Sequence, residues 1–458
     1  MQSGNKKSEK STLLLVLNNT YKNNRKNTLL NHIEKDLLSF LLACAMVNLR
    51  WLNSYSFFIN EYVGEDFFMQ KKDIKVEIED LKQIFLYSKK IGFFLGAGTS
   101  CAMGLPNVWD LTKEVESRVN PKLVEKYRIV KNLVPKVNNI HPENVTIEHI
   151  LNLVRQIKDL TNARADLLFL EISGTDSMEL DREICKQIYC IISEKETNAD
   201  TLVMRRFIAW LGICNNYEVK EIFTTNYDLI VERSLEKNEI PYFDGFVGGY
   251  EPFFWPESIE KEVLCKDLTY SWVRLWKIHG SLNWEFKNGS SRIIRTSRKE
   301  IPTNELVIYP SKEKYNLSRK QPFIAYFDRL KQYLRNGEIT LVMSGYSFAD
   351  QHINDIIFSA LRENTLLFCL VFCYSDDQVN EMEKFSTTFL NLSVYGPNRG
   401  IIRGTVVEWE FPEEQDESTK SYLYEGKELG LGDFSQLAEF LITSSGKTIN
   451  TAGDDDEV

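Results

Sequence analysis

Residues 89–106 read KKIGFFLGAGTSCAMGLP, and the change from apolar to glycine-rich sequence within them indicates how the chain is built. The apolar run Ile91–Leu95 predicts a buried β-strand. It ends at Gly96–Ser100, where glycine permits a tight turn and the polar residues can begin a helix. Backbone N–H groups at a helix N-terminus bind anions, so the segment is typical of a turn that holds a pyrophosphate. Because such turns occur in many α/β proteins, other segments must support this interpretation.

Two later segments provide that support. Glu221–Asp228 reads EIFTTNYD, and Leu275–Ser281 reads LWKIHGS. Each is a short hydrophobic strand that ends in polar, chemically capable residues. In an open parallel sheet, ligands bind outside the carboxyl ends of the strands. Three such strand ends in one chain therefore predict a ligand site at that edge of a sheet.

The three segments resemble motifs of the sirtuin (silent information regulator 2) superfamily. The patterns G-A-G-x-S-x-x-x-G-x-P, T-x-N-x-D and H-G occur in the order that this family uses. A fourth segment, Met343–Asp350 (MSGYSFAD), is similar to the family's Gly-x-Ser strand end, which holds the adenosine ribose. The resemblance spans roughly residues 85–380 and is greatest to the bacterial sirtuin-like NAD-degrading domains of anti-phage systems.

The resemblance implies an α/β fold with a Rossmann-like parallel sheet, helices on both faces, a large helical insertion at about 111–220 and no zinc module. It implies an NAD⁺ hydrolase that releases nicotinamide and ADP-ribose and depletes cellular NAD during phage infection. The catalytic residues that it implies are Asn226, His279 and Asp228. The NAD-binding residues that it implies are Gly96, Ala97, Gly98, Thr99, Ser100, Pro106, Thr225, Gly345 and Ser347.

The chemistry of NAD cleavage agrees with these residue types. Nicotinamide leaves as a neutral molecule, so the enzyme mainly has to orient the ribose, stabilise an oxocarbenium-like cation and deliver a nucleophile. The imidazole of His279 can accept a proton near neutral pH, and the amide of Asn226 can hold ribose hydroxyls or a water. Asp228 either caps the following helix or shapes the nicotinamide side. Thr224 and Thr225 can instead satisfy local backbone groups.

The chain departs from the deacetylating sirtuins at two places. The aromatic and arginine residues of their G-I-P-D-F-R motif are replaced by Val108 and Trp109, and no cysteine lies between His279 and Gly345. The four-cysteine zinc module is therefore not expected, and water is the favoured acceptor of ADP-ribose. The alternatives are an NAD-dependent deacylase or ADP-ribosyltransferase, and a non-catalytic nucleotide sensor. We expect Gly98 to accept no side chain, because the backbone approaches the pyrophosphate there, and we expect a side chain to remove NAD binding without unfolding the chain.

Composition restricts the functional class. The chain has 458 residues and a formal net charge of −10, which makes direct nucleic-acid binding a poor default. Its 8 cysteines form no C-x-x-C pair and follow no secretory signal, so we expect reduced thiols in a cytoplasmic protein. The most apolar N-terminal run, Leu37–Val47, is too short to span a membrane.

The predicted organisation has three parts: an N-terminal helical extension (1–75), the NAD-binding catalytic domain (76–400), and a C-terminal strand, helix and acidic tail (401–458). Residues 31–70 combine a leucine-rich helix with many aromatic residues, so we expect them to form a homo-oligomer contact. The alternative is packing against the chain's own insertion. The family resemblance also implies a separate partner, such as a HerA-like ATPase.

Overall fold

The computed structural model describes residues 70–213, 219–260, 272–287, 292–296, 306–308, 321–412, 422–424 and 427–445. The predicted N-terminal extension before residue 70 and the acidic tail at 454–457 lie outside the described residues.

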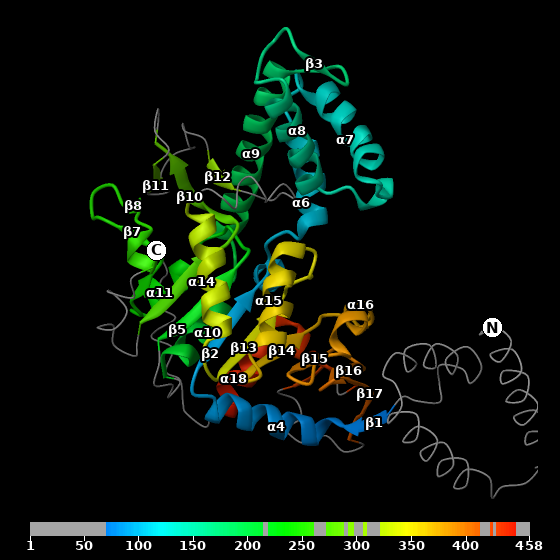
Figure 1. The fold of residues 1–458 in the computed structure, drawn as a ribbon, viewed down its shortest axis with the longest axis vertical. Helices are drawn as coiled ribbons and strands as arrows, with labels where there is room; N and C mark the ends of the chain where they lie inside the picture. Colours follow the sequence, from blue (N-terminus) through cyan, green and yellow to red (C-terminus); the bar gives the residue numbers. More distant parts are fainter. Residues whose placement is uncertain are drawn as a thin grey trace, which may run out of the picture. The chain divides into compact units, whose positions relative to one another are not determined.

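A ten-stranded, mostly parallel sheet forms the centre of the described chain (Figure 1). In spatial order its strands are β1 (Gln70–Asp73), β17 (Thr405–Glu410), β16 (Arg399–Ile402), β15 (Leu392–Tyr395), β14 (Leu367–Phe372), β13 (Ile339–Ser344), β2 (Ile91–Leu95), β5 (Lys220–Thr224), β9 (Val273–Lys277) and β6 (Tyr242–Phe243). Only the β15–β16 and β16–β17 pairs are antiparallel. The sheet confirms the predicted α/β class, and β2, β5 and β9 confirm the three strands predicted before the polar motif residues.

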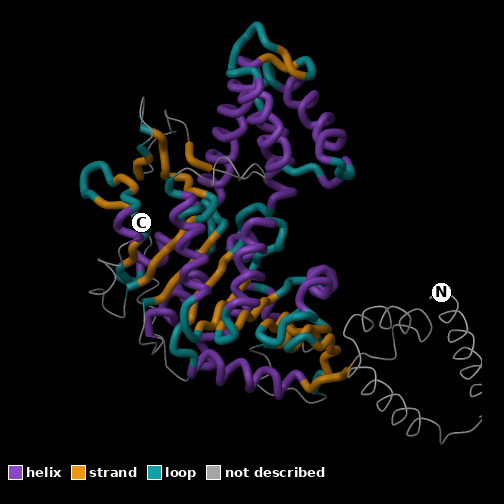
Figure 2. Tube along the Cα trace, viewed as in Figure 1, coloured by secondary structure: helices purple, strands orange, loops and turns teal. Residues whose placement is uncertain are grey.

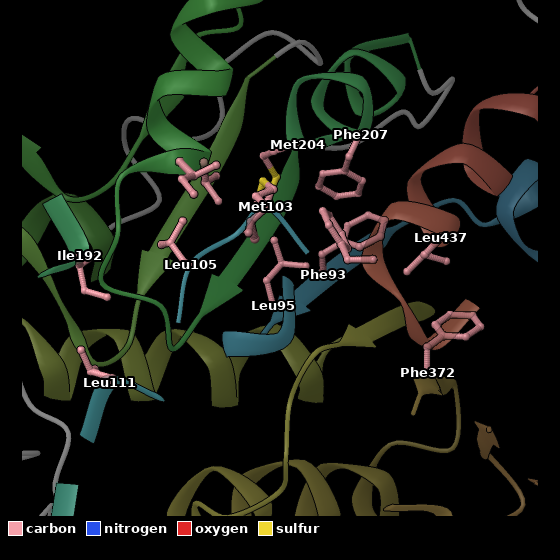
Figure 3. Close-up of a cluster of buried hydrophobic side chains, with 14 of the residues drawn as sticks. Phe93, Leu95, Met103, Leu105, Leu111, Ile192, Met204, Phe207, Phe372 and Leu437 are labelled. Carbon is pink, nitrogen blue, oxygen red and sulfur yellow. The ribbon is translucent and has the colours of Figure 1, made fainter. Parts of the chain in front are cut away.

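Helices cover both faces of the sheet, because successive side chains of its buried strands point in opposite directions. Phe93 of β2 belongs to one apolar core and Phe94 to the other. The Phe93 face is covered by α4 (Ile74–Tyr87), α10 (Leu202–Ile213), α11 (Ile230–Lys237) and α18 (Phe434–Ser444). The Phe94 face is covered by α14 (Phe323–Arg335), α15 (Gln351–Glu363) and α16 (Asp376–Ser386). Figure 3 shows Phe93 beside Phe207 of α10. The ring centroids of these two residues are 4.9 Å apart.

The described part of the insertion between β2 and β5 is mostly helical. It comprises α6 (Val108–Arg118), α7 (Val124–Asn138), α8 (Ile147–Leu160) and α9 (Gly174–Thr197), followed by α10. Between α8 and α9 the chain forms a short hairpin of β3 (Leu168–Phe169) and β4 (Ile172–Ser173) (Figure 2). The expectation of an all-helical insertion is therefore wrong at this hairpin. Its strands of two residues are too short to produce a recognisable alternation in the sequence.

A second sheet, which the sequence analysis did not predict, takes its strands from both sides of the H-G motif in the sequence. Its five short strands are antiparallel, in the order β12 (Leu306–Ile308), β10 (Gly280–Phe286), β11 (Ile293–Arg295), β8 (Phe253–Phe254) and β7 (Phe246–Val247). The remaining described elements are α5 (Ala97–Cys101), η2 (Pro142–Asn144), α12 (Glu257–Glu260), β18 (Leu423–Tyr424), β19 (Glu428–Leu429) and η3 (Gly430–Gly432). The predicted boundary after residue 400 falls within β16, so the central sheet continues past it.

A buried ionic cluster fixes α14 to the sheet. Glu221 of β5 is only 1% exposed. Its carboxylate accepts hydrogen bonds from Arg274 (2.9 Å), Trp276 (2.8 Å) and Arg329 of α14 (3.1 Å from Nε). Burial alone would raise the pKa of Glu221, but Arg329 and Arg274 outweigh burial and hold that pKa below its ordinary value. The carboxylate therefore stabilises the fold above its unfolded-state pKa, and the contribution is lost as pH falls through the folded-state pKa.

Glu221→Gln should destabilise the protein by about 3–5 kcal/mol, because it leaves two buried guanidinium groups without their counter-charge. Urea unfolding followed by circular dichroism measures the change. The matched control is Glu338→Gln, which removes an exposed pair with Lys89 whose N and O atoms lie 3.5 Å apart and should leave the midpoint unchanged. Equal midpoints for the two variants would contradict the assigned role of the cluster.

Candidate active site

Four neighbouring parallel strands end level with one another. Ser344 of β13 pairs with Leu95 of β2, Leu95 pairs with Thr224 of β5, and Thr224 pairs with Lys277 of β9. The segments that follow these strands therefore leave the sheet at one edge. All four segments that the sequence motifs identified meet there, as the carboxyl-end rule for parallel sheets requires.

The glycine turn after β2 lies directly against the turn after β13. A Cβ atom at Gly96 would lie 2.3 Å from Gly345 O, and one at Gly98 would lie 2.6 Å from Gly345 Cα. Gly345 itself has φ +65°, a conformation that residues with side chains rarely adopt. The Gly98 N–H donates to Gly345 O over 2.9 Å, so this N–H is already used within the chain. The outer surface of the turn is formed by Ala97 and Gly98, which are exposed.

Asn226 connects the loop after β5 to the glycine turn. Its side-chain amide Nδ2 donates to Gly96 O (2.9 Å), to Thr99 Oγ1 (3.1 Å) and to Ser100 Oγ (2.8 Å). Its backbone N–H donates to Thr224 Oγ1 over 3.0 Å. The residue is 8% exposed, and these contacts hold its side chain in one orientation.

Ser100 joins the two predicted catalytic residues of this loop. Its hydroxyl accepts from Asn226 and donates to Asp228 Oδ2 over 2.7 Å. The other carboxylate oxygen, Asp228 Oδ1, accepts from the backbone N–H of Ile230 over 3.1 Å. Asp228 lies one residue before the N-cap Leu229, so it accepts one N–H group at the start of α11 without being the cap residue, and it also contacts Ser100 in the turn.

His279 reaches across the sheet edge to a residue that the sequence analysis did not select. Its Nε2 lies 3.0 Å from Oδ2 of Asp350. His279 follows β9, whereas Asp350 lies between β13 and α15, and β2 and β5 separate those two strands. At about 4.8 Å between neighbouring strands, the contact bridges roughly 14 Å of sheet. It therefore spans the edge at which the loop of Asn226 emerges.

Lys277 is a second residue that the motifs did not reveal. Its side chain is 2% exposed, and its ammonium group donates to Glu232 Oε1 (2.8 Å), to Ser281 Oγ (2.8 Å) and to the carbonyl of Asp228. Burial raises the pKa of Glu232, and Lys277 acts in the opposite direction. The ammonium group thus links the Asp228 loop to the turn that carries His279. A lysine within an apolar strand was the signal that could have identified it.

The other predicted residues occupy the same edge without comparable contacts. The backbone N–H of Thr225 donates to Leu95 O over 3.2 Å. The hydroxyl of Thr224 donates to Leu95 O over 2.8 Å and accepts from the N–H of Asn226 over 3.0 Å, which supports the local-backbone alternative for Thr224. Pro106 is half-buried in the loop between α5 and α6, and Ser347 is exposed after β13. Burial raises the pKa of Cys101, with Asp110 and Asp228 adding to the effect, so its thiolate is disfavoured as a nucleophile. The binding roles of these residues stay predictions.

In the described part of the chain, no group of three or more histidine, cysteine or acidic side chains is placed to hold a metal ion. No helix in that part is both long and apolar enough to cross a membrane.

Part of the chain is similar to a known protein family. Residues 220–389 match the family model described as a SIR2-like domain, and this range contains Asn226, Asp228, His279 and Gly345. The match covers less than half of the chain. No curated protein matches the sequence.

The similar solved structures include a Sir2 homologue in complex with NAD, with 13% identity, a TM-score of 0.35, and coverage of 67% of this chain and 85% of that chain. Another is a Sir2 homologue variant in complex with ADP-ribose, with 11% identity, a TM-score of 0.35, and coverage of 81% and 99%.

Gly98→Ala should lower the thermal midpoint, because its Cβ would meet backbone atoms of Gly345 that cannot rotate away. Overpacking of this kind costs about 1–3 kcal/mol. This differs from the expectation that a side chain at Gly98 would leave the fold intact. Gly249→Ala is the matched control, since a Cβ there meets nothing within 4 Å. Calorimetric melting that shows no difference between the two variants would refute the contact.

Proposed function

We propose that the protein is an NAD⁺ hydrolase that releases nicotinamide and ADP-ribose. The observation that carries the proposal is the meeting of Asn226, Asp228 and His279 with the glycine turn at one edge of the parallel sheet. The SIR2-like match over residues 220–389 supports an NAD-related enzyme. The four motifs occur in the order expected for that family, and each lies at the end of one of four adjacent strands.

The proposed reaction requires little acid catalysis. The electron pair of the bond between ribose C1′ and nitrogen goes to nicotinamide, which leaves neutral. A water oxygen bonds to C1′, and one proton of that water is released to a base. In our proposal His279 accepts this proton, and the side chain of Asn226 orients the ribose or the water. Asp228 places a negative charge near the cation that develops on the ribose.

The biological setting is proposed on the family resemblance alone. We propose that NAD depletion by this enzyme acts in anti-phage defence in the cytoplasm, and that a separate ATPase of the HerA type controls it. We also propose that the chain forms a homo-oligomer through residues 31–70. An uncontrolled NAD hydrolase would harm its own cell, which is the reason to expect such control.

Incubation of the full-length protein with NAD⁺ should produce nicotinamide and ADP-ribose in equal amounts, as measured by chromatography. A chelator should not change the rate, because the proposed mechanism uses no metal. Addition of an acetyl-lysine peptide should also leave the rate unchanged, because water is the acceptor. Nicotinamide release that depends on the peptide would instead identify a deacylase. Failure to bind or cleave NAD⁺, alone and with the ATPase partner, would exclude the proposed function.

His279→Ala and Asn226→Ala should each lower kcat/KM for NAD⁺ cleavage by about 10²–10⁴-fold, the usual contribution of a general base or a positioned polar group. The matched controls are His141→Ala and Asn198→Ala, which change exposed residues of the helical insertion and should retain wild-type rates. Melting curves identify loss of fold, which matters most for Asn226 because three acceptors lose their donor. Folded variants with wild-type turnover would place the site elsewhere.

A further inference from the structure

Asp350 begins α15 and at the same time contacts His279. One carboxylate oxygen, Oδ1, accepts the backbone N–H groups of His352 (3.0 Å) and Ile353 (3.4 Å), as an N-terminal helix cap does. The other oxygen, Oδ2, lies 3.0 Å from His279 Nε2. Both residues are largely buried, with side-chain exposures of 14% for His279 and 6% for Asp350. One carboxylate oxygen of Asp350 thus caps the helix, and the other contacts His279.

The segment that carries Asp350 is also fixed by hydrogen bonds that do not involve His279. Tyr346 donates its hydroxyl to Asn354 Oδ1 over 3.0 Å, and Asn354 Nδ2 donates to Phe348 O over 2.7 Å. Phe348 has φ +55°, a conformation that a bulky residue adopts only when its surroundings impose it. This strained residue lies two positions before Asp350, the residue that contacts His279. Strain of this kind concentrates at functional sites.

We propose that Asp350 is a positioning residue that decides which ring nitrogen of His279 carries the proton. An ionised carboxylate can only accept hydrogen bonds, and its place at a helix N-terminus favours the negative charge. The proton of neutral His279 therefore lies on Nε2, and the lone pair lies on Nδ1. This inference rests on the proposed function in one respect: it makes Nδ1 the atom that receives the proton during NAD⁺ cleavage.

A different result is expected if the contact between Asp350 and His279 is only structural. If Asp350 only tied two loops together, any substitution that kept the loops in place would leave the state of the imidazole unchanged. Asp350→Asn tests this directly. The carbonyl oxygen of the new amide stays bound to the N–H groups of His352 and Ile353, because only an acceptor can cap the helix. The amide NH₂ then faces His279 Nε2 and requires a lone pair there.

The experiment is nuclear magnetic resonance of histidine-labelled full-length protein, in which ¹⁵N shifts distinguish a protonated ring nitrogen from one with a lone pair. The chain has only 5 histidines, and His279→Gln assigns the signal of His279. Wild-type protein should show the proton on Nε2, and Asp350→Asn should move it to Nδ1. Asp73→Asn makes the same change at the cap of α4, where Asp73 accepts from Lys75 over 2.9 Å, and should leave the His279 signal as in wild type.

The kinetic readout separates this inference from the proposed function. Asp350→Asn should lower kcat for NAD⁺ cleavage by about 10²–10⁴-fold with little change in KM, since a base in the wrong tautomer is lost while binding groups remain. An unchanged tautomer in Asp350→Asn overturns the inference whatever the turnover. If Asp350→Asn switches the tautomer but the wild-type protein shows no NAD⁺ turnover, alone and with the ATPase partner, the positioning role is supported and the hydrolase function is excluded.

Discussion

The backbone contact between the turns after β2 and β13 is the constraint on which the rest of the site depends. Gly345 occupies the space that a side chain on Gly96 or Gly98 would need. Because β2 and β13 are neighbours that end level, this contact sets the start of the segment that leads to Asp350. The same turn supplies Gly96 O and Ser100 Oγ as acceptors for Asn226. Because Gly96, Gly98 and Gly345 have no side chains, the two turns can touch, and this contact helps to place Asn226 and its acceptors.

One buried charged residue lies near the start of β5 and another at the end of the neighbouring strand β9, and the two have different roles. Glu221 near the start of β5 is fully paired and fastens α14, so it serves the stability of the fold. Lys277 at the end of β9 also has several acceptors, which belong to the loop of Asp228, to the following helix α11 and to the start of β10 after His279. Removing one of these partners would leave a buried positive charge without compensation and would strongly destabilise the protein. The fixed separation between those segments is thus enforced by electrostatics rather than by apolar packing.

The sequence was sufficient to predict the central strands and the four polar segments, because each motif combines a continuous apolar run with glycine or polar residues at its end. It was not sufficient to find Asp350 or the second sheet. Asp350 and His279 lie 71 positions apart, and nothing in either local pattern records that they meet. The strands β7 and β8 have two residues each, too few for an alternation to be visible. Contacts that arise only when distant segments pack together were therefore missed, and so was the packing reason for Gly98.

The position of the helical insertion has a consequence for how the chain folds. Thr224 donates its hydroxyl to Leu95 O across 129 positions of sequence, so the pairing of β2 with β5 closes a long loop. The entropy lost in closing a flexible loop grows with its length, and contacts between distant residues slow folding. Helices α8 and α9 pack on each other and include many buried residues of their own. An insertion that collapses early shortens the flexible chain between the two strands, so the rate at which this edge of the sheet forms depends on helical residues that lie outside the sheet.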